Sequence, residues 1–479
     1  MRWILIFLLL MTCGCTGQTN QRHELVEGNH DGGSLEKTYE RLPEKPPQEK
    51  ERKIWDFQPN CGKDAACPHF PITAIFEWSG KQIGEAYYIV SISNIVVYKE
   101  RLYFTAYAKS KDYAVSPTRY TMHYAIDFTG KVLWVKHRHG RFGGTLTMTK
   151  NGVLLSSFNI FSKNSSDNEY IIHAIRASDG KLLWSHVIPN AEKRRYTMAS
   201  VANKMVIVGG PNLIAWDEFS GKKLWERSLS EPGESIPLDG EDKPVLGKEH
   251  IYVFSSIGNI LAFDFQGNKQ WSTMIPGLPK AQGAIAIGKD KDLIVSTGYY
   301  LFSLSKVGEI KWSAKQSSNR LTIDRHGNIY TTTRGPYYTA SYTHEGKKRW
   351  ELFNVAYHDP NDLLGYAVDP PMTFYDGLFY LGASTYSMGF GWIDFQGVVK
   401  QRFTGFDDVR FFTGDFNYIE ETGQLVTFFR DPRIPYEPNP TKDTPHQRML
   451  LILIDIGKKK LDGYWPMRFH DPRNSSSVE

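Results

Sequence analysis

Four cysteines are the residues of this 479-residue sequence whose types and positions suggest chemistry. Cys13 and Cys15 follow an apolar N-terminal run, whereas Cys61 and Cys67 lie in the stretch NCGKDAACPH, close to His69. A cysteine thiol can be acylated, oxidised to a disulfide or used as a metal ligand. The compartment of the protein decides between these outcomes, and the N-terminal residues bear on that compartment.

The N-terminal residues MRWILIFLLLMTCGCTG have the pattern of an export signal. Arg2 supplies a positive charge, Trp3 to Met11 are apolar and uncharged, and small residues follow. A span of the hydrocarbon core needs roughly 20 apolar residues, so this run is too short to cross it. The pattern predicts a signal peptide at residues 1–15 and an extracytoplasmic body, with a non-cleaved anchor as the alternative.

The same segment resembles a bacterial lipoprotein signal. In that family a small residue precedes a cysteine, and the thiol of this cysteine receives a diacylglycerol before cleavage. Cys15 follows Gly14 and fits, although Thr12 stands where leucine is commoner in the family. The resemblance implies lipidation at Cys15 and attachment to a membrane, with ordinary secretion as the alternative. Because Thr16 and not aspartate follows, it also implies the outer membrane of a bacterial envelope, facing the periplasm.

Cys61 and Cys67 are expected to form a disulfide, because an exported chain meets an oxidising compartment. In the chain-entropy model, closing so short a loop contributes about 2 kcal/mol. Metal binding with help from His69 is the alternative, but the spacing matches no standard zinc pattern.

The composition outside the signal predicts two unfolded segments around one body. Residues 16–71 are predicted to be a flexible tether that carries the disulfide loop, since the polar, charged stretch up to about residue 53 has few apolar side chains to bury. Residues 468–479 are predicted to be a disordered tail. The whole chain has 57 basic and 52 acidic residues, a net charge of +5, which gives no argument for nucleic acid as a partner.

A recurring turn organises the rest of the sequence. It appears in DFTGKVLW at 127–134, ASDGKLLW at 177–184 and DFQGNKQW at 264–271. Its glycines recur at intervals of roughly 40 to 60 residues, and they are Gly130, Gly180, Gly221, Gly267, Gly308, Gly346, Gly397 and Gly457. Tryptophan stands four residues after six of them, as Trp134, Trp184, Trp225, Trp271, Trp312 and Trp350. Gln401 and Leu461 take that place in the last two repeats.

Each repeat contains short stretches with period-two alternation, such as IYVFSS and NILAFDF, before its glycine. Three short strands, a turn and a fourth strand with tryptophan are what a propeller blade requires. The sequence therefore predicts an all-β fold, a β-propeller of four-stranded blades over residues 72–467. Eight glycines predict eight blades, and seven remain an alternative because the last two repeats are degenerate. Residues 74–84 are expected to supply the outer strand of the last blade and so close the ring.

The motif residues are expected to be structural. Glycine permits the positive φ of a tight turn, and Asp127, Asp264 and Asp394 can close the turn with their side chains. The six tryptophans, with the six glycines that precede them, are expected to dock neighbouring blades together, because a large flat ring buries much area. A sugar- or cofactor-stacking surface is the alternative for such a row of tryptophans.

The motif D-x-x-G-K-x-x-W after an alternating strand resembles the tryptophan-docking motif of quinoprotein-type β-propellers. The dehydrogenases of that family hold a quinone with calcium, a base aspartate and, in many members, a disulfide between adjacent cysteines. This body has neither adjacent cysteines nor a calcium-loop pattern, and G-x-S-x-G, H-E-x-x-H and phosphate-loop motifs are missing from the sequence. No catalytic, cofactor-binding or metal-binding residue is therefore predicted.

Two inserts depart from the plain repeat, at residues 354–371 and 428–448. Inserts in repeat proteins map to loops and often to binding faces, and the second insert is rich in proline and aromatic residues. Both are candidates for partner contact, with plain structural loops as the alternative. A third insert, at 161–170, is polar and is interpreted as a hairpin extension.

In signal, repeat and fold the sequence resembles the propeller lipoproteins of the outer-membrane β-barrel assembly machinery. The resemblance implies a non-catalytic scaffold that docks envelope proteins, including barrel-assembly components. The long tether and the large late inserts depart from that family. A propeller lipoprotein with another client, a quinone-dependent enzyme and a ligand- or glycan-binding surface protein are the alternatives.

Overall fold

The chain divides into two units, Met1–Arg41 and Leu42–Glu479, and the residues described here all belong to the second. The structure is a computed structural model. It describes residues 72–79, 87–92, 95–110, 119–139, 141–142, 146–160, 169–188, 197–201, 204–210, 212–229, 244–276, 283–315, 320–332, 338–353, 366–367, 370–383, 388–404, 416–430, 448–464, 466–467 and 471.

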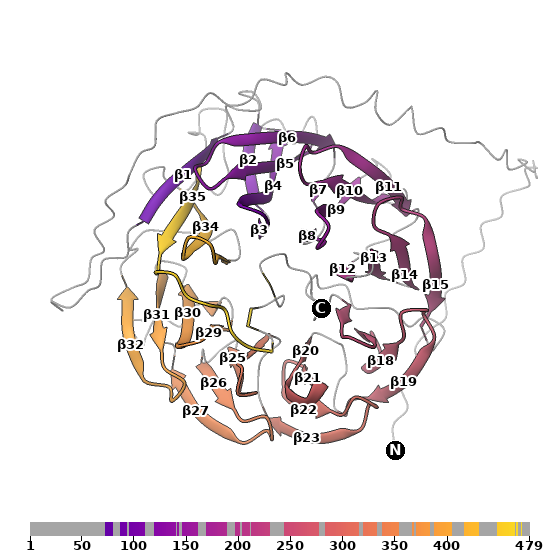
Figure 1. The fold of residues 1–479 in the computed structure, drawn as a ribbon, viewed down its shortest axis with the longest axis vertical. Helices are drawn as coiled ribbons and strands as arrows, with labels where there is room; N and C mark the ends of the chain where they lie inside the picture. Colours follow the sequence, from indigo (N-terminus) through magenta and orange to yellow (C-terminus); the bar gives the residue numbers. More distant parts are fainter. Residues whose placement is uncertain are drawn as a thin grey trace, which may run out of the picture. The chain divides into compact units, whose positions relative to one another are not determined.

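These residues form eight antiparallel sheets that follow one another around a ring (Figure 1). Blade 1 consists of β2 (Tyr87–Ile92), β3 (Val96–Val97), β4 (Arg101–Ser110), β5 (Arg119–Asp127) and β6 (Val132–His139). Blade 2 consists of β7 (Arg141–Phe142), β8 (Thr147–Met148), β9 (Val153–Ile160), β10 (Glu169–Arg176) and β11 (Leu182–Ile188). Blade 3 consists of β12 (Thr197–Val201), β13 (Met205–Gly209), β14 (Asn212–Asp217) and β15 (Lys223–Ser228).

The middle blades are the most regular. Blade 4 consists of β16 (Val245–Leu246), β17 (Ile251–Phe254), β18 (Asn259–Phe263) and β19 (Lys269–Met274). Blade 5 consists of β20 (Ala284–Ile287), the 3₁₀ turn η2 (Lys289–Lys291), β21 (Leu293–Ser296), β22 (Tyr300–Leu304) and β23 (Ile310–Lys315). Blade 6 consists of β24 (Leu321–Ile323), β25 (Ile329–Thr332), β26 (Tyr338–Tyr342) and β27 (Lys348–Phe353).

The last two blades complete the ring. Blade 7 consists of β28 (Tyr366–Ala367), β29 (Met372–Phe374), β30 (Gly377–Ala383), β31 (Met388–Ile393) and β32 (Val399–Thr404). Blade 8 consists of β33 (Asn417–Ile419), β34 (Gln424–Arg430), β35 (Arg448–Asp455) and β1 (Ile72–Ser79). The expected all-β propeller is confirmed, with eight blades and not seven.

Within each blade we name the strands A to D from the centre of the ring to its rim. Because neighbouring strands are antiparallel, the A–B and C–D turns lie at one end of a blade and the B–C turn at the other. We call these ends the A–B/C–D face and the B–C face of the ring. The D strands, such as β15, β19 and β23, run along the rim (Figure 1).

The core lies between neighbouring blades. All residues of β17 and β18, the B and C strands of blade 4, are buried, because adjacent blades cover both faces of these strands. The D strand β19 instead alternates between exposed and half-buried residues, because only one of its faces meets a neighbour. One apolar cluster runs from Val245 in blade 4 to Tyr342 in blade 6 and so joins three blades.

The ring is closed by the N-terminal strand. β1 pairs with β35 from Ile72 opposite Ile454 to Ser79 opposite Arg448, which confirms the closure expected near residues 74–84. Phe76 of β1 is buried, and its ring centroid lies 5.8 Å from that of Phe104 in blade 1. The closing strand therefore joins blade 8 to blade 1 by main-chain pairing and by aromatic packing.

The segment after β35 does not continue blade 8. The eighth repeat has Leu461 at the place of the tryptophan, but β1 forms the outer strand of this blade, as expected for residues 74–84. Leu461 instead forms an isolated bridge with Phe374 in the inner strand of blade 7. The chain leaves blade 8 at this point because the outer edge of β35 is already paired.

We call the described residues of 456–467 the C-terminal strap. In Figure 1 this yellow segment passes from β35 across the inner side of blades 7 and 6. The Asp462 N–H donates to the Thr373 carbonyl, and the Thr373 N–H donates to the Pro466 carbonyl. Gly463 lies so close to the carbonyl of Ile323 in blade 6 that a side-chain Cβ would clash with it. The strap therefore connects the inner strands of consecutive blades.

Candidate functional site

The six motif tryptophans lie on D strands and face the next blade. The indole Nε1 of Trp184 donates to the main-chain oxygen of Glu218, 2.8 Å away, in the C–D turn of blade 3. The other five indoles make the same contact with the following blade, from Trp134 to Ala177, Trp225 to Phe265, Trp271 to Lys306, Trp312 to His344 and Trp350 to Phe395. Each of these indoles thus spans a seam between two blades.

The glycine that each tryptophan covers is that of the following repeat. A Cβ on Gly221 would lie 2.6 Å from Cγ of Trp184, and one on Gly346 would lie 2.5 Å from Cε3 of Trp312. The same close approach is found at Gly180, Gly267, Gly308 and Gly397. All of these glycines have positive φ, so both the backbone conformation and the indole leave no place for a side chain.

Two seams have no such pair. Gly130, in the C–D turn of blade 1, lies against the main chain of Ile75 in β1, so the closing strand takes the place of an indole. At the seam between blades 7 and 8, a Cβ on Gly457 would meet nothing within 4 Å. Gln401 stands at the tryptophan position there. The two seams on either side of blade 8 therefore lack the pair of tryptophan and glycine that the other six seams share.

At three seams the residue two places after the tryptophan makes a second hydrogen bond to the next blade. His186 Nε2 lies 2.8 Å from the Gly221 carbonyl oxygen, Arg227 Nε donates to that of Gly267, and Thr273 Oγ1 donates to that of Gly308. These side chains are a histidine, an arginine and a threonine, so no common sequence letter marks the role. Sequence reasoning missed them for that reason.

The C–D turns are closed by side-chain caps. Asp217 Oδ1 accepts from the N–H of Ser220 at 2.8 Å and from that of Phe219 at 3.2 Å. The Ser220 N–H, and then its hydroxyl, lower the pKa of Asp217 because they favour the charged carboxylate. Equivalent caps are found at Asp127, Asp264 and Asp394.

Glu218 is the most unusual acid among the described residues. Its side chain is fully buried between blades 2 and 3, and Asn151 Nδ2 donates to Oε1 at 2.5 Å. Oε2 is buried and has no hydrogen-bond partner. Burial raises the pKa of this carboxyl group, although hydrogen bonds from Asn151 and Thr149 oppose the rise.

A buried histidine in blade 1 has the contacts of a catalytic base but no access to substrate. His123 Nδ1 lies 2.9 Å from Thr105 Oγ1, and Nε2 lies 3.3 Å from Ser156 Oγ in blade 2. A histidine beside a serine hydroxyl can activate a nucleophile. All three side chains are fully buried, with at most 1% exposed, so this trio joins two blades and does not form a catalytic site.

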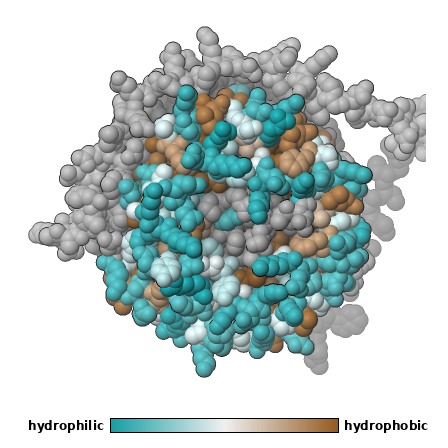
Figure 2. Space-filling model, in the orientation of Figure 1, coloured by the Kyte–Doolittle hydropathy of each residue, from teal (hydrophilic) through white to brown (hydrophobic). Residues whose placement is uncertain are grey.

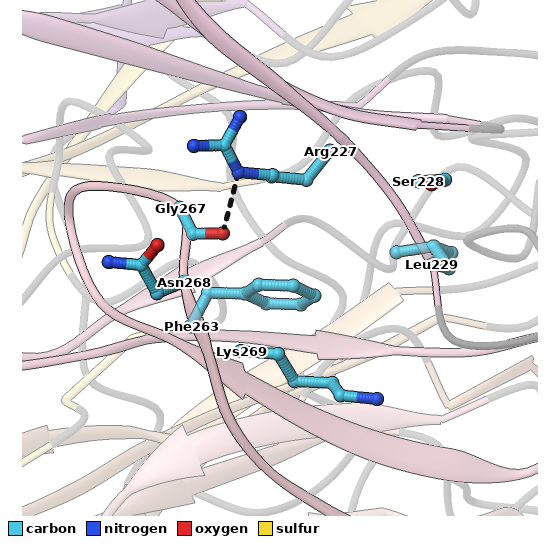
Figure 3. A pocket seen from close by; sticks show the side chains of 7 residues that line it. All are labelled: Arg227, Ser228, Leu229, Phe263, Gly267, Asn268 and Lys269. Atoms are coloured by element: carbon cyan, nitrogen blue, oxygen red, sulfur yellow. Dashed lines mark hydrogen bonds between the residues drawn. The ribbon is translucent and has the colours of Figure 1, made fainter.

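A cavity of about 410 Å³ lies at the seam between blades 3 and 4 (Figure 3). Its lining includes Arg227, Leu229, Phe263 and Lys269. The Nε of Arg227 points at the Gly267 carbonyl oxygen and holds one wall (Figure 3). Because Arg227 is used in the seam and the lining includes residues of the D strands β15 and β19, we describe the cavity as a rim groove.

Large apolar side chains are exposed at the B–C face of blades 4 and 5. Ile257 is 43% exposed, Met274 59%, Tyr299 66% and Tyr300 38%. The Ile275 N–H donates to the Gly258 carbonyl, which places the end of β19 beside the turn that holds Ile257. We call these four residues the B–C apolar group. Tyrosine and methionine are enriched in protein interfaces, so this group is a candidate contact for a protein partner.

Several expected sites lie outside the described residues. These are the lipidation site Cys15, the disulfide cysteines Cys61 and Cys67, and most of the inserts at 354–371, 428–448 and 161–170. Within the described residues no group of three or more histidine, cysteine or acidic side chains is arranged to hold a metal ion. In the same part of the chain, no helix has the length and apolar character needed to cross a bilayer.

A family model described as outer membrane protein assembly factor BamB matches residues 167–334, from blade 2 to blade 6. This part of the propeller is similar to that family. The crystal structure of BamB from Moraxella catarrhalis superposes with a TM-score of 0.51 at 15% identity, over 77% of this chain and 98% of that chain. The resemblance to quinoprotein-type propeller repeats is confirmed by these matches.

Sqt1 from Chaetomium thermophilum, bound to the N-terminus of a ribosomal protein, superposes with a TM-score of 0.50 at 11% identity, over 79% of this chain and 98% of that chain. At such identities the two likenesses establish the fold alone, because unrelated functions share propellers. A comparison with curated proteins finds no match.

Proposed function

We propose that this protein is a non-catalytic, lipid-anchored propeller scaffold that binds envelope proteins during outer-membrane protein assembly. The observation that carries the proposal is the match of residues 167–334 to the assembly-factor family. The structure of the ring is compatible with it, because its buried polar groups tie blades together and leave a rigid body. Rigid surfaces bind partners with little loss of conformational entropy.

The contact surface proposed for a protein partner is the B–C apolar group. Exposed apolar side chains that gather at one place mark interaction sites more often than isolated ones do. The group lies in blades 4 and 5, within the residues that match the assembly-factor family. An extended segment or a sheet edge of a partner would bury Met274 and Tyr299 there.

Affinity capture of the acylated protein from its native envelope tests this proposal. In the test variant, Met274→Ser and Tyr299→Ser remove the two most exposed side chains of the group, at 59% and 66%. The matched control carries Val307→Ser and Val398→Ser, which are 57% and 52% exposed on C–D turns. We expect barrel-assembly components to co-purify with the wild type and the control, and to be lost with the test variant.

Either of two results would count against the proposal. If no barrel-assembly component co-purifies with the wild type, the proposed function is wrong. If the test variant retains the same proteins as the control, the contact lies elsewhere, and the insert at 428–448 is the next candidate. Because β34 ends at Arg430 and β35 begins at Arg448, only residues 431–447 should then be replaced by a Gly-Ser turn.

The anchor is tested separately by metabolic labelling with a fatty-acid analogue. We expect Cys15→Ser to abolish labelling and Cys13→Ser to leave it unchanged, since Gly14 precedes only the second of these cysteines. Labelling that survives Cys15→Ser would contradict the proposed lipidation site. The proposed Cys61–Cys67 disulfide predicts that alkylation of these thiols requires prior reduction.

A further inference from the structure

Basic side chains mark the A–B turn of every blade from 1 to 6. Five of them are exposed lysines, and the sixth is a half-exposed arginine. They are Lys99, Lys150, Lys204, Lys248, Lys291 and Arg325. Because the blades follow one another around the ring, these residues form an arc of positive charge on the A–B/C–D face.

A second arc comes from the C–D turns of the same blades. In each of these turns a lysine lies close to the motif glycine, and all six are exposed. They are Lys131, Lys181, Lys222, Lys269, Lys306 and Lys347. The C strand lies further from the centre than the A strand, so this arc surrounds the first.

Contacts between the turns show that both arcs belong to one surface. Arg101, beside the A–B turn of blade 1, donates from Nη1 to the Ser178 carbonyl in the C–D turn of blade 2. Asn151 in the A–B turn of blade 2 donates to Glu218 in the C–D turn of blade 3. The turns therefore alternate across the face, and their lysines are exposed on it.

Exposed acids on these turns are fewer. They are Glu100, Asp179, Glu249, Asp290, Glu309 and Glu345. Lys291 makes an ion pair with Glu249 at 2.8 Å, and Arg325 makes one with Asp462 of the C-terminal strap at 3.3 Å. The remaining C–D aspartates, such as Asp264, fold back onto the N–H groups of their own turn and are half-buried. The outermost charge on the face is therefore mainly positive.

Exposed apolar residues occur on both faces among the described residues. The B–C apolar group lies on the opposite face in blades 4 and 5, whereas Val307 and Val398 lie in C–D turns. Figure 2 shows one side of the ring. On this side hydrophilic residues cover most of the described surface, and hydrophobic residues appear in small separate groups. The near balance of 57 basic and 52 acidic residues in the whole chain does not reveal the exposed lysines that the described turns place on the A–B/C–D face.

We propose that the A–B/C–D face of blades 1 to 6 docks onto a membrane surface of anionic phospholipids. The lysines are spread over a broad face and do not converge on a pocket, so they match a surface with distributed negative charge. Each lysine within a Debye length of an anionic leaflet adds to the attraction. The inference rests on the proposed envelope location for access to such a membrane, where a lipid anchor and a polybasic surface would reinforce each other.

Vesicle co-sedimentation tests the docking face. The full chain carries Cys13→Ser and Cys15→Ser, so that no acyl chain contributes, and it is mixed with vesicles of phosphatidylcholine with or without phosphatidylglycerol. The test variant adds Lys181→Gln, Lys204→Gln, Lys222→Gln and Lys248→Gln. Since each lysine contributes about fivefold to partitioning on an anionic surface, we expect binding to phosphatidylglycerol vesicles to fall by more than about tenfold.

The matched control removes four acids from the same face, with Glu100→Gln, Glu249→Gln, Glu309→Gln and Glu345→Gln. We expect this variant to bind phosphatidylglycerol vesicles more tightly than the parent does. Binding of the parent should disappear at about 1 M salt, where the Debye length is about 3 Å. Thermal melting of both variants checks that they are folded.

Three results would overturn the docking proposal. The first is equal binding of the parent to vesicles with and without phosphatidylglycerol, and the second is unchanged vesicle binding of the lysine variant. The third is that the parent binds no vesicles while the lysine variant loses envelope proteins in the capture experiment. This last result would assign the A–B/C–D face to an acidic protein. The capture experiment contains no added vesicles, so failure of the docking face and failure of the proposed function are distinguishable.

Discussion

The indole of Trp184 in blade 2 covers Gly221 in blade 3 so closely that a Cβ on Gly221 would lie 2.6 Å from the indole Cγ. The same indole donates its N–H to the main chain of the turn that Gly221 belongs to. One pair of residues therefore combines apolar burial, a hydrogen bond and a left-handed backbone at a single seam. The ring repeats this arrangement at five further seams.

Replacing Trp184 measures what the seam contributes. Trp184→Phe keeps a ring but leaves the Glu218 carbonyl without its donor, so we expect a loss of about 1 kcal/mol beyond the change in packing. Trp184→Ala should lower the free energy of unfolding by about 3 to 5 kcal/mol, as for buried aromatics elsewhere. Urea denaturation measures both. The control, Trp271→Phe, should cost less because Trp271 is more exposed, and an equal cost would contradict the argument.

Substitutions at two glycines distinguish the loss of stability caused by backbone conformation from the loss caused by steric overlap. Gly457 has a φ of 78° and open space around its Cβ position, whereas Gly221 has a φ of 68° and faces Trp184. We expect Gly457→Ala to destabilise by about 1 to 2 kcal/mol through its left-handed conformation alone. Gly221→Ala should cost a further 1 to 3 kcal/mol or so through overpacking. Equal shifts in the denaturation midpoint would show that the indole moves away without cost.

Two acids of blade 3 should respond oppositely to pH. Burial raises the pKa of Glu218 in the folded state above its ordinary value of 4.5, so its ionised form destabilises the fold at neutral pH. That cost decreases as the pH falls through the raised pKa, and it vanishes below about 4.5. Relative to Glu218→Gln, the wild type should therefore gain stability on acidification.

Glu226 provides the control with the opposite sign. Its hydrogen bonds with Lys223 and then with Asn212 lower its pKa, so the stability that it contributes is present above 4.5 and is lost as the pH falls through the lowered pKa. Relative to Glu226→Gln, the wild type should lose stability on acidification. Urea denaturation of the wild type and both variants at about pH 8 and about pH 4 measures how the difference in free energy of unfolding changes with pH. Changes of the same sign for Glu218→Gln and Glu226→Gln would refute the opposite pKa shifts of these two acids.

The C-terminal strap should detach when Gly463 acquires a side chain. Gly463→Ala places a Cβ against the Ile323 carbonyl, so the chain must move away from blade 6. We expect faster hydrogen exchange at the Asp462 amide, which donates to Thr373, with little change in blade 4. Arg325→Ala is the milder companion, since it removes one ion pair at 3.3 Å and one stacking contact with Tyr375. Unchanged exchange in Gly463→Ala would show that the strap tolerates the methyl group.

The repeat, the all-β class and the expectation of eight blades could be predicted from the sequence because their causes are local. A glycine at positive φ, an aspartate that caps its own turn, and period-two alternation each depend on a few neighbouring residues. Asp264 and Gly267, for example, lie in one turn and interact within it. Repetition of such a unit leaves a pattern that one sequence shows without an alignment.

Only the tertiary structure decided which residues meet across the ring. Trp184 covers a glycine of the next repeat, and Leu461 pairs with Phe374 in blade 7 because β1 already forms the outer strand of blade 8. The positive charge of the A–B/C–D face could not be predicted for the same reason, since Lys204 and Lys222 come together only when their strands alternate in direction. These contacts join different strands and blades, and no pattern within a few neighbouring residues encodes them.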